Sequence, residues 1–421
     1  MKIVYAVDKY GPHGPIPNSI GMQTDEFFSH LYRTPISQGM SYFALPDFHK
    51  FIGYDAVYAH HTDILANTEL YASQGPIVYM VNIHHNMQYQ SHFLFASGRG
   101  SWITYLPANI ISLWKKKKCK IIISHIWDDC DLDFINRILD SFYKEFGSCD
   151  NMYVWTTSIF KSTDVEKINP AYRNSLIHIP YAEMWSVSQL PPYVEPKHSV
   201  VKNKKFIKLV RRYSEGRVLS HISFTKENLN DYGFVSIPET CTGAGKTLHE
   251  YIRNDLSIDD CNDIKPSVLD QVASADNEKD SYHNGWLGFA NREELLDYFH
   301  HSYFSIVFES RFERPKSYWF YTEKLIRAML YKHPFILMCI PNSLEYLQHA
   351  GYQTFSDFWP EDYDKITDYQ ERVQRVTEIV KDICTSVDLD DMTLRCNEIL
   401  EHNRNNVYHR INEFKLYLLN F

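Results

Sequence analysis

The sequence predicts an α/β protein with parallel, doubly wound sheets, and a stretch in its last third predicts this most clearly. Residues 303–308 form a short β-branched and aromatic run, which is typical of a buried strand. From Thr322 apolar residues recur at helical spacing until a proline, and Phe335–Cys339 forms a second strand. Pro341–Ser343 opens another helix that ends near Gly351. Strands and helices that alternate over short connections favour a parallel sheet, which binds ligands at the carboxyl ends of its strands.

Two domains of this kind are expected, because 421 residues exceed what one core usually holds. Three prolines within 188–196 predict a linker. The expected domains are therefore 1–190, 197–385 with a polar insertion at 240–285, and a helical tail at 386–421. The insertion is polar and acidic, which favours a mobile lid over core.

The individual elements follow from apolar runs and their period. Strands are predicted at 1–7, 56–59, 77–81, 120–126, 152–156, 176–180, 204–210 and 234–237. Helices are predicted at 132–146, from Gly216, at 367–385, and at 390–420 as one long helix or two. Residues 86–112 are rich in aromatic residues, glycine and serine, which predicts an irregular segment.

Composition narrows the class of protein. A hydrophobic fraction of 44% supports a large core, and eight cysteines without a CxxC pair indicate reduced thiols in a cytoplasmic protein. The first residues are too short an apolar run for a signal peptide, and no run reaches the length of a membrane-spanning segment. The net charge of −9 argues against a dedicated nucleic-acid binder, although residues 1–120 hold 10 Lys and Arg against 7 Asp and Glu.

Two motifs carry a family resemblance. The segment F-E-S…Y-T-E-K-L…H-P-F-I, within 308–336, resembles the donor-binding segment of α1,3-fucosyltransferases, whose pattern is F-E-N-S…Y-x-T-E-K. It is also similar to a group of virus- and bacterium-encoded glycosyltransferases that share T-E-K…H-P-F and the motif at 344–355. An upstream K-K-F-L-x-L-x-R-R-x-x-x-x-R motif of that group is matched by 204–212 and Arg217. The resemblance covers roughly 206–383, and the Asn of F-E-N-S is absent here.

This resemblance implies a GT-B-like fold, in which two Rossmann-like domains face each other with their parallel sheets across a cleft. It implies a transferase that moves a sugar from a nucleotide-sugar donor to an acceptor hydroxyl, with inversion. No cofactor is obligatory, and a divalent metal is compatible but not required. The N-terminal domain would bind the acceptor and the C-terminal domain the nucleotide sugar, in the cytoplasm of a cell or of a virus-infected host.

Donor-binding residues are predicted where the matched motifs meet strand ends and a helix start. By the resemblance, Glu323 binds the ribose hydroxyls and Lys324 the diphosphate, at a helix start where a cation adds to the dipole. Glu309 ends a strand, and it is either a donor residue or a structural carboxylate paired with Arg311 or Arg314. The structural alternative is that Glu323 and Lys324 are an ordinary exposed pair on a helix, and that the arginines form a solvated basic surface. The full set of candidates is Arg211, Arg212, Arg217, Glu309, Thr322, Glu323 and Lys324.

An inverting enzyme also needs a base on the acceptor side. Asp128 and Asp129 follow a predicted strand and are the first candidates, and Asp8 is the second. Asp131 and Asp133 are better explained as carboxylates that a helix N-terminus favours.

Three short patterns offer other chemistry. The D-x-D at 129–131 would suit a metal-dependent GT-A transferase, but such short patterns often match by chance. Residues 242–247 resemble the end of a P-loop whose first glycine is replaced by Thr240. The histidine pairs at 60–61, 84–85 and 300–301 lack the partner spacing of a metal site, so no metal site is predicted.

The acceptor stays open between two classes. One is a glycan or a lipid-linked sugar, and the other is a hydroxymethylated base in phage or viral DNA. The run Lys115–Lys118, the basic segment 202–217 and the aromatic segment 86–112 favour DNA, whereas the acidic balance opposes it. A non-catalytic module that binds sugar nucleotides or glycans is a further alternative, and the sequence does not predict the oligomeric state.

Overall fold

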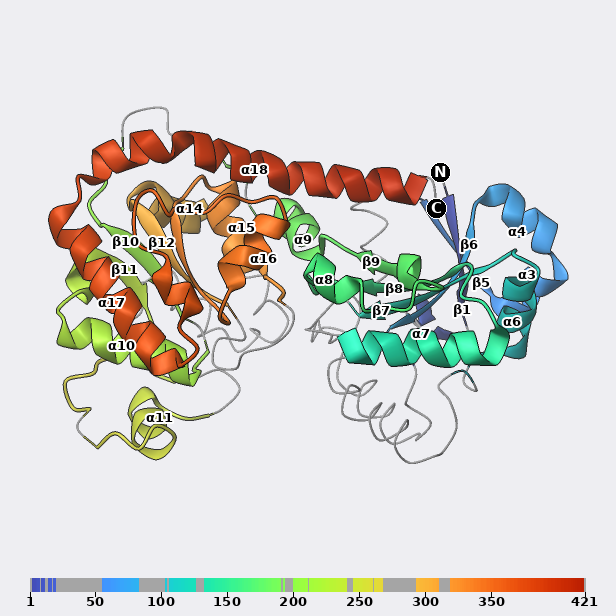
Figure 1. Cartoon of the computed structure of the whole chain (residues 1–421), viewed down its shortest axis with the longest axis horizontal. Helices are drawn as coiled ribbons and strands as arrows, with labels where there is room; N and C mark the ends of the chain where they lie inside the picture. Colours follow the sequence, from blue (N-terminus) through green and yellow to red (C-terminus); the bar gives the residue numbers. More distant parts are fainter. Residues whose placement is uncertain are drawn as a thin grey trace. The chain divides into compact units, whose positions relative to one another are not determined.

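The structure is a computed structural model of the chain, shown in Figure 1. The chain divides into two compact units, which are described separately: Met1–Met184 with Ile411–Phe421 (unit 1), and Trp185–Arg410 (unit 2). The residues described are 2–7, 9–11, 14–16, 18–19, 55–82, 103, 106–125, 132–190, 192–193, 200–210, 212–240, 245–259, 261–267, 293–309 and 319–419.

Unit 1 contains a parallel sheet in the order β5-β1-β6-β7-β8-β9, to which β4 adds a short parallel pairing with β6. A separate antiparallel pair joins β2 and β3. The strand bounds are β1 Lys2–Val7, β2 Lys9–Gly11, β3 Gly14–Ile16, β4 Asn18–Ser19, β5 Asp55–His60, β6 Ile77–Asn82, β7 Lys120–His125, β8 Met152–Thr156 and β9 Leu176–His178. All six strands predicted for this part of the chain are confirmed to within two residues.

Helices cover this sheet with apolar faces. The apolar face of α7 places Phe134, Ile138 and Phe142 in the core with Ile121 and Trp114, and each such side chain contributes ~1.5–3 kcal/mol by burial. The prediction that 86–112 is irregular is wrong at its C-terminal end, because residues 108–112 belong to α6, whose apolar residues Ile110 and Leu113 lie in the same core. The helix bounds are α3 His61–Ala66, α4 Thr68–Gln74, α6 Ala108–Lys115, α7 Leu132–Phe146, α8 Ser162–Val165, η3 Arg173–Ser175 and α9 Tyr181–Gln189.

Unit 2 contains a four-stranded parallel sheet in the order β11-β10-β12-β13. Its strands are β10 Phe206–Leu209, β11 Gly233–Ser236, β12 Phe304–Phe308 and β13 Phe335–Met338. Every strand predicted for this part of the chain is confirmed. Together with unit 1, this confirms the expected α/β class, with a parallel sheet in each unit.

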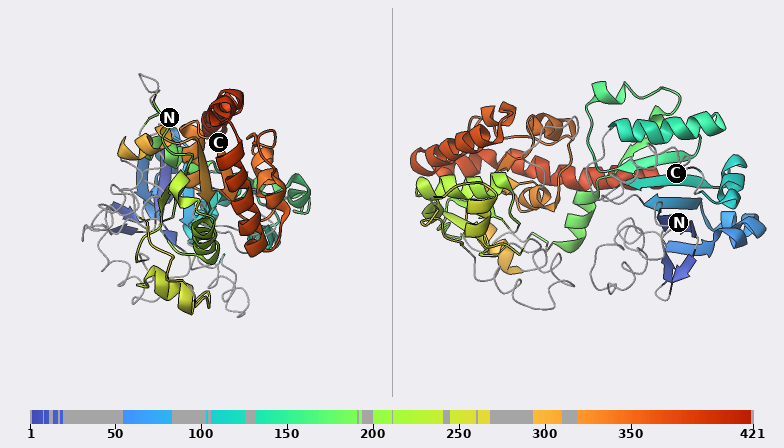
Figure 2. Two further views of the ribbon diagram at one scale, coloured as in Figure 1. Left: turned by 90° about the vertical axis from the view of Figure 1, so that its left-hand side faces the viewer. Right: turned by 90° about the horizontal axis from the view of Figure 1, so that it is seen from below.

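Helices lie on both faces of this second sheet, and α10 and α17 lie side by side (Figure 1, Figure 2). The helix bounds are α10 Glu215–Lys226, η4 Asn230–Tyr232, α11 Leu248–Asn254, α14 Glu293–His300, α15 Glu323–Leu330, α16 Ser343–His349, η5 Asp362–Lys365, α17 Tyr369–Ser386 and α18 Leu389–Leu419. The boundary between the units falls inside α9, which also occupies the first two residues of the predicted linker.

The prediction that 240–285 is a lid rather than core is wrong for the part of it that the structure describes. Leu248 and Ile252 of α11, with Cys261 and Ile264, are buried in one cluster with residues of α10 and of the strand ends. The segment misled because its average composition is polar, while its few aliphatic residues stand at the i, i+4 spacing of a helix face. A capping box between Thr247 and Glu250 starts α11.

The tail is one helix, α18, of 31 residues. Its last part belongs to unit 1, where Phe414 packs edge-on against Trp155 at a ring distance of 5.8 Å. None of the helices in the described part of the chain combines the length and the apolar character needed to cross a bilayer.

Candidate functional site

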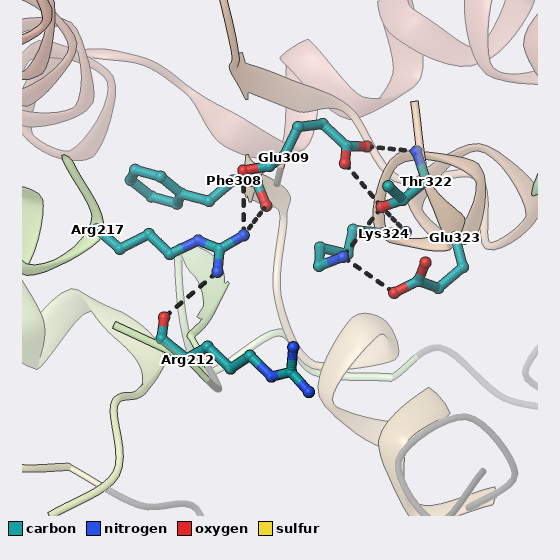
Figure 3. A network of polar contacts seen from close by, with 7 residues as sticks. All are labelled: Arg212, Arg217, Phe308, Glu309, Thr322, Glu323 and Lys324. Atoms are coloured by element: carbon teal, nitrogen blue, oxygen red, sulfur yellow. Dashed lines mark hydrogen bonds and ion pairs between the residues drawn. The ribbon is translucent and has the colours of Figure 1, made fainter. Parts of the chain in front are cut away.

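The order of the strands in unit 2 marks one edge of its sheet. The central strands β10 and β12 pair directly, but the chain continues from β10 to β11 on one side and from β12 to β13 on the other. Connections that leave in opposite directions create a topological switch point, and open α/β sheets bind their ligands there. Six of the predicted donor-binding residues follow these two strands (Figure 3): Arg212, Arg217, Glu309, Thr322, Glu323 and Lys324.

Glu309 follows the last residue of β12 and is 1% exposed. Its two carboxylate oxygens accept separate hydrogen bonds from Thr322, one from the backbone N–H at 2.9 Å and one from the hydroxyl at 2.7 Å. Burial raises the pKa of Glu309, and the charge of Lys324 and the bonds from Thr322 oppose this rise. The alternative partners Arg311 and Arg314 lie outside the described residues. Glu309 therefore connects the end of β12 to the start of α15.

Arg217 lies in the first turns of α10 and is 9% exposed. Its Nη2 donates to the carbonyl oxygens of Phe308 at 3.2 Å and Glu309 at 3.0 Å, and its Nη1 donates to that of Arg212 at 3.3 Å. The guanidinium thus ties the loop after β10 to the end of β12, and it keeps a positive charge at the switch point. Figure 3 shows the exposed side chain of Arg212 extending away from this contact.

The start of α15 holds an ammonium and a carboxylate side by side. Thr322 is the predicted N-cap, and its hydroxyl accepts from the backbone N–H of Lys324. The ammonium of Lys324 donates to the Thr322 hydroxyl and to Oε1 of Glu323, both at 3.0 Å. Burial raises the pKa of Glu323, but Lys324 and Arg327 lower it by more, so that the net shift is downward. Glu323 is therefore held as an anion.

This pair retains capacity for a ligand. An ammonium has three N–H donors, and within the described residues two of those on Lys324 are used. The side chains of Lys324 and Glu323 are 32% and 23% exposed, so both reach solvent. The arrangement can therefore donate to an anionic oxygen and accept from hydroxyl groups at neighbouring points.

The other predicted residues are distributed differently. Arg211, Asp8, Asp128 and Asp129 lie outside the described residues, as do both aspartates of the D-x-D pattern. Asp133 is exposed in the first turn of α7, as expected for a carboxylate at a helix N-terminus. The structure therefore brings together six of the seven residues predicted to bind a donor, and the predicted bases stay predictions.

The residues of the P-loop-like segment that the structure describes have local partners. Lys246 forms an ion pair with Asp255 at 2.8 Å, and Thr247 caps α11. Of the histidine pair at the end of α14, His301 is bound through Nδ1 to the carbonyl oxygen of Val201 at 3.0 Å. Across the described ranges, no three His, Cys, Asp or Glu side chains gather in a way that could hold a metal ion.

Two buried basic residues of unit 2, Lys208 and His221, were not predicted from the sequence. Lys208 of β10 is fully buried, with its Nζ 4.3 Å from the ring centre of Phe224 and 5.7 Å from that of Phe308. Burial lowers the pKa of Lys208 to about 7. Burial and then the charge of Lys208 lower the pKa of His221 to about 4, while its Nε2 donates to the carbonyl oxygen of Lys265 at 2.9 Å. The signal was the strand alternation, which places Lys208 on the same face as the core residue Phe206.

Comparisons with known proteins add little to this geometry. No family model matches the chain, and no curated protein matches it. Among solved structures, the chain is similar to a UDP-forming α,α-trehalose-phosphate synthase from Burkholderia xenovorans, with 12% identity. That similarity covers 98% of this chain and 97% of the other, with a TM-score of 0.34. A similarity at this level carries no argument about fold or activity, which rest on the two sheets and on the contacts of Figure 3.

Proposed function

We propose that this chain is a GT-B-like glycosyltransferase that binds a nucleotide-sugar donor at the carboxyl ends of β10 and β12. The observation that carries the proposal is the adjacent placement of the Glu323 carboxylate and the Lys324 ammonium at the switch point of the unit 2 sheet. A nucleotide sugar offers a diphosphate beside a ribose with two hydroxyl groups. These are the partners that an ammonium and a carboxylate at neighbouring points recognise.

Each residue has a distinct role in this proposal. Lys324 donates its remaining N–H to a diphosphate oxygen, and Glu323 accepts from the ribose hydroxyls. The N-terminal amides of α15 and the charge of Arg217 add positive potential. These groups stabilise the negative charge that builds up on the leaving diphosphate in the transition state. Cations supplied by the chain make an obligatory metal unnecessary for this step.

The acceptor half of the reaction is proposed from the sequence. A carboxylate of the N-terminal domain, Asp128, Asp129 or Asp8, would remove the proton of the acceptor hydroxyl as it attacks the sugar from the opposite side to the leaving group, with inversion. The acceptor is a glycan or a hydroxymethylated base in DNA. Binding to duplex DNA that weakens steeply with added salt would favour the second.

The donor site is tested with Lys324→Ala and Glu323→Ala. A screen of UDP, GDP, CMP and their sugars by thermal shift identifies the nucleotide, because a ligand that binds the native state raises the Tm. Each substitution is expected to weaken the Kd of the identified nucleotide sugar by ~10–100-fold, the loss of one charge-assisted hydrogen bond, in a protein that remains folded.

A matched control separates the site from a general effect of charge. Lys381 of α17 also forms an ion pair in unit 2, with Glu227 at 2.7 Å, and Glu227 follows the C-terminal end of α10, whereas Arg217 lies in its first turn. Lys381→Ala should leave the Kd unchanged. Wild-type affinity in both site variants would remove the donor-site assignment.

A further inference from the structure

The buried carboxylate of Glu309 holds Thr322 at two points. Both hydrogen-bond donors of Thr322, its backbone N–H and its hydroxyl, point to separate oxygens of this one side chain. A carboxylate has no hydrogen to give in these bonds, so the Thr322 hydroxyl must donate to it. The lone pairs of the hydroxyl therefore face away from Glu309.

Those lone pairs receive Lys324. The Thr322 hydroxyl accepts from the ammonium of Lys324 at 3.0 Å and from its backbone N–H at 3.4 Å (Figure 3). The same ammonium also donates to Glu323, so it is held at two points instead of moving freely on its four-carbon stem. A cation that is already ordered loses less conformational freedom when a ligand binds.

We propose that Glu309 is a positioning residue for an anion-binding site. It sets the direction of the Thr322 hydroxyl, and through that hydroxyl it places Lys324 so that the remaining N–H points to an oxygen of a diphosphate. Glu309 itself does not touch the ligand. The inference rests on the proposed donor site for the nature of the ligand, whereas the placement of Lys324 is independent of it.

Three substitutions separate this role from simple packing. In Glu309→Gln the amide oxygen can still accept from the Thr322 N–H, but the amide nitrogen is a donor. The Thr322 hydroxyl must then turn and accept from that nitrogen, which leaves one lone pair fewer for Lys324. Thr322→Val keeps the shape and removes the hydroxyl, and Thr322→Ser keeps the hydroxyl. Glu361→Gln is the matched control, because Glu361 is another carboxylate of unit 2 that accepts a backbone N–H, from Phe355 at 2.8 Å.

The first measurement needs no ligand. The rate at which an amine-acylating ester modifies Lys324 is followed by peptide mass spectrometry, with the exposed Lys226 of α10 as internal reference. We expect faster acylation of Lys324, relative to Lys226, in Glu309→Gln and Thr322→Val, and the wild-type rate in Thr322→Ser and Glu361→Gln. An unchanged rate in a folded Glu309→Gln protein would overturn the positioning role.

The second measurement uses inorganic pyrophosphate and a double-mutant cycle, read by calorimetry. Glu309→Gln is expected to weaken pyrophosphate binding about tenfold in the wild type. In a protein that already carries Lys324→Met, it is expected to cause no further loss. Additive losses would show that Glu309 does not act through Lys324. If the wild type binds no pyrophosphate, or binds it equally well without Lys324, the donor site and the anion-binding part of this inference both fail. The acylation rates then still decide the placement of Lys324.

Discussion

Replacing Lys208 by Met is expected to stabilise the protein in a manner that depends on pH. Lys208 is fully buried between two aromatic rings, and its Nζ has no hydrogen-bond partner among the residues that the structure describes. Its neighbours in the adjoining strands are Val235 and Ile306, which do not titrate, and the titratable group coupled to it is His221. Among the described residues the charged form has no compensating anion, and Met keeps the length of the side chain without the charge.

The magnitude follows from the pKa of Lys208, which burial lowers from 10.5 to about 7. Each pKa unit corresponds to ~1.4 kcal/mol, so burial of the ammonium form costs about 5 kcal/mol. Between these two pKa values the unfolded chain binds more protons than the folded one, and stability must rise with pH. The cost is present in full below pH 7 and disappears as the pH approaches 10.5.

Denaturant unfolding of wild type and Lys208→Met at pH 7, 8 and 9 measures this directly. Through the linkage relation, the advantage of the variant should fall from about 4 kcal/mol at pH 7 to about 2 kcal/mol at pH 9. Comparison with the wild type cancels the titration of other groups. Lys226→Met, an exposed position on α10, should show no such trend.

A difference between Lys208→Met and wild type that does not vary with pH would refute the reasoning. It would mean that the folded state keeps the ammonium charged over this whole range, with a partner or with water that stabilises it.

Two further predictions concern packing. Leu248→Ala should lower the free energy of unfolding by ~2–5 kcal/mol, because Leu248 is fully buried. Chemical denaturation measures this loss, and Arg253→Ala is the control at an exposed position. A loss no larger than that of the control would mean that this segment is not part of the core. Deleting 411–421 should expose Trp155 and shift its fluorescence to the red, since Phe414 packs on it. The deletion should cause no such shift in a protein that carries Trp155→Phe, and the full chain with Leu416→Ala, a change at an exposed position, should also show none. An unshifted spectrum after the deletion alone would contradict the packing of Phe414 on Trp155.

The sequence predicted local features well, because each has a local cause. The strand at 304–308 is short and apolar, and α15 begins at its predicted cap, Thr322, because a threonine hydroxyl satisfies a free backbone N–H. The doubly wound order of the sheet follows from strands that alternate with helices. These rules act within a few residues of the chain, so a sequence is enough to apply them.

The contacts that build the site were out of reach for the same reason. Arg217 contacts the carbonyl oxygen of Glu309, which is 92 positions further along the chain, and Glu309 contacts Thr322, which is 13 positions after it. The sequence placed these residues near a cleft, but whether Glu309 faces a ligand or a neighbour depends on side-chain directions set by the folded sheet. The apolar face of α11 was missed because an average over a polar segment hides two leucine-sized residues at helical spacing.

The tail of α18 has a consequence for how the chain folds during synthesis. The compact unit that begins at Met1 includes Ile411–Phe421. Trp155 can therefore pack against Phe414 only after this last segment has been synthesised. About 230 residues separate the two parts of this unit, and at ~5–20 residues per second the delay is on the order of tens of seconds. Unit 2 is continuous in sequence, but it is also completed late, because α10 packs against α17, which begins at Tyr369. The apolar surface around Trp155 is therefore the part of unit 1 that a nascent-chain chaperone would need to cover until Phe414 has been made.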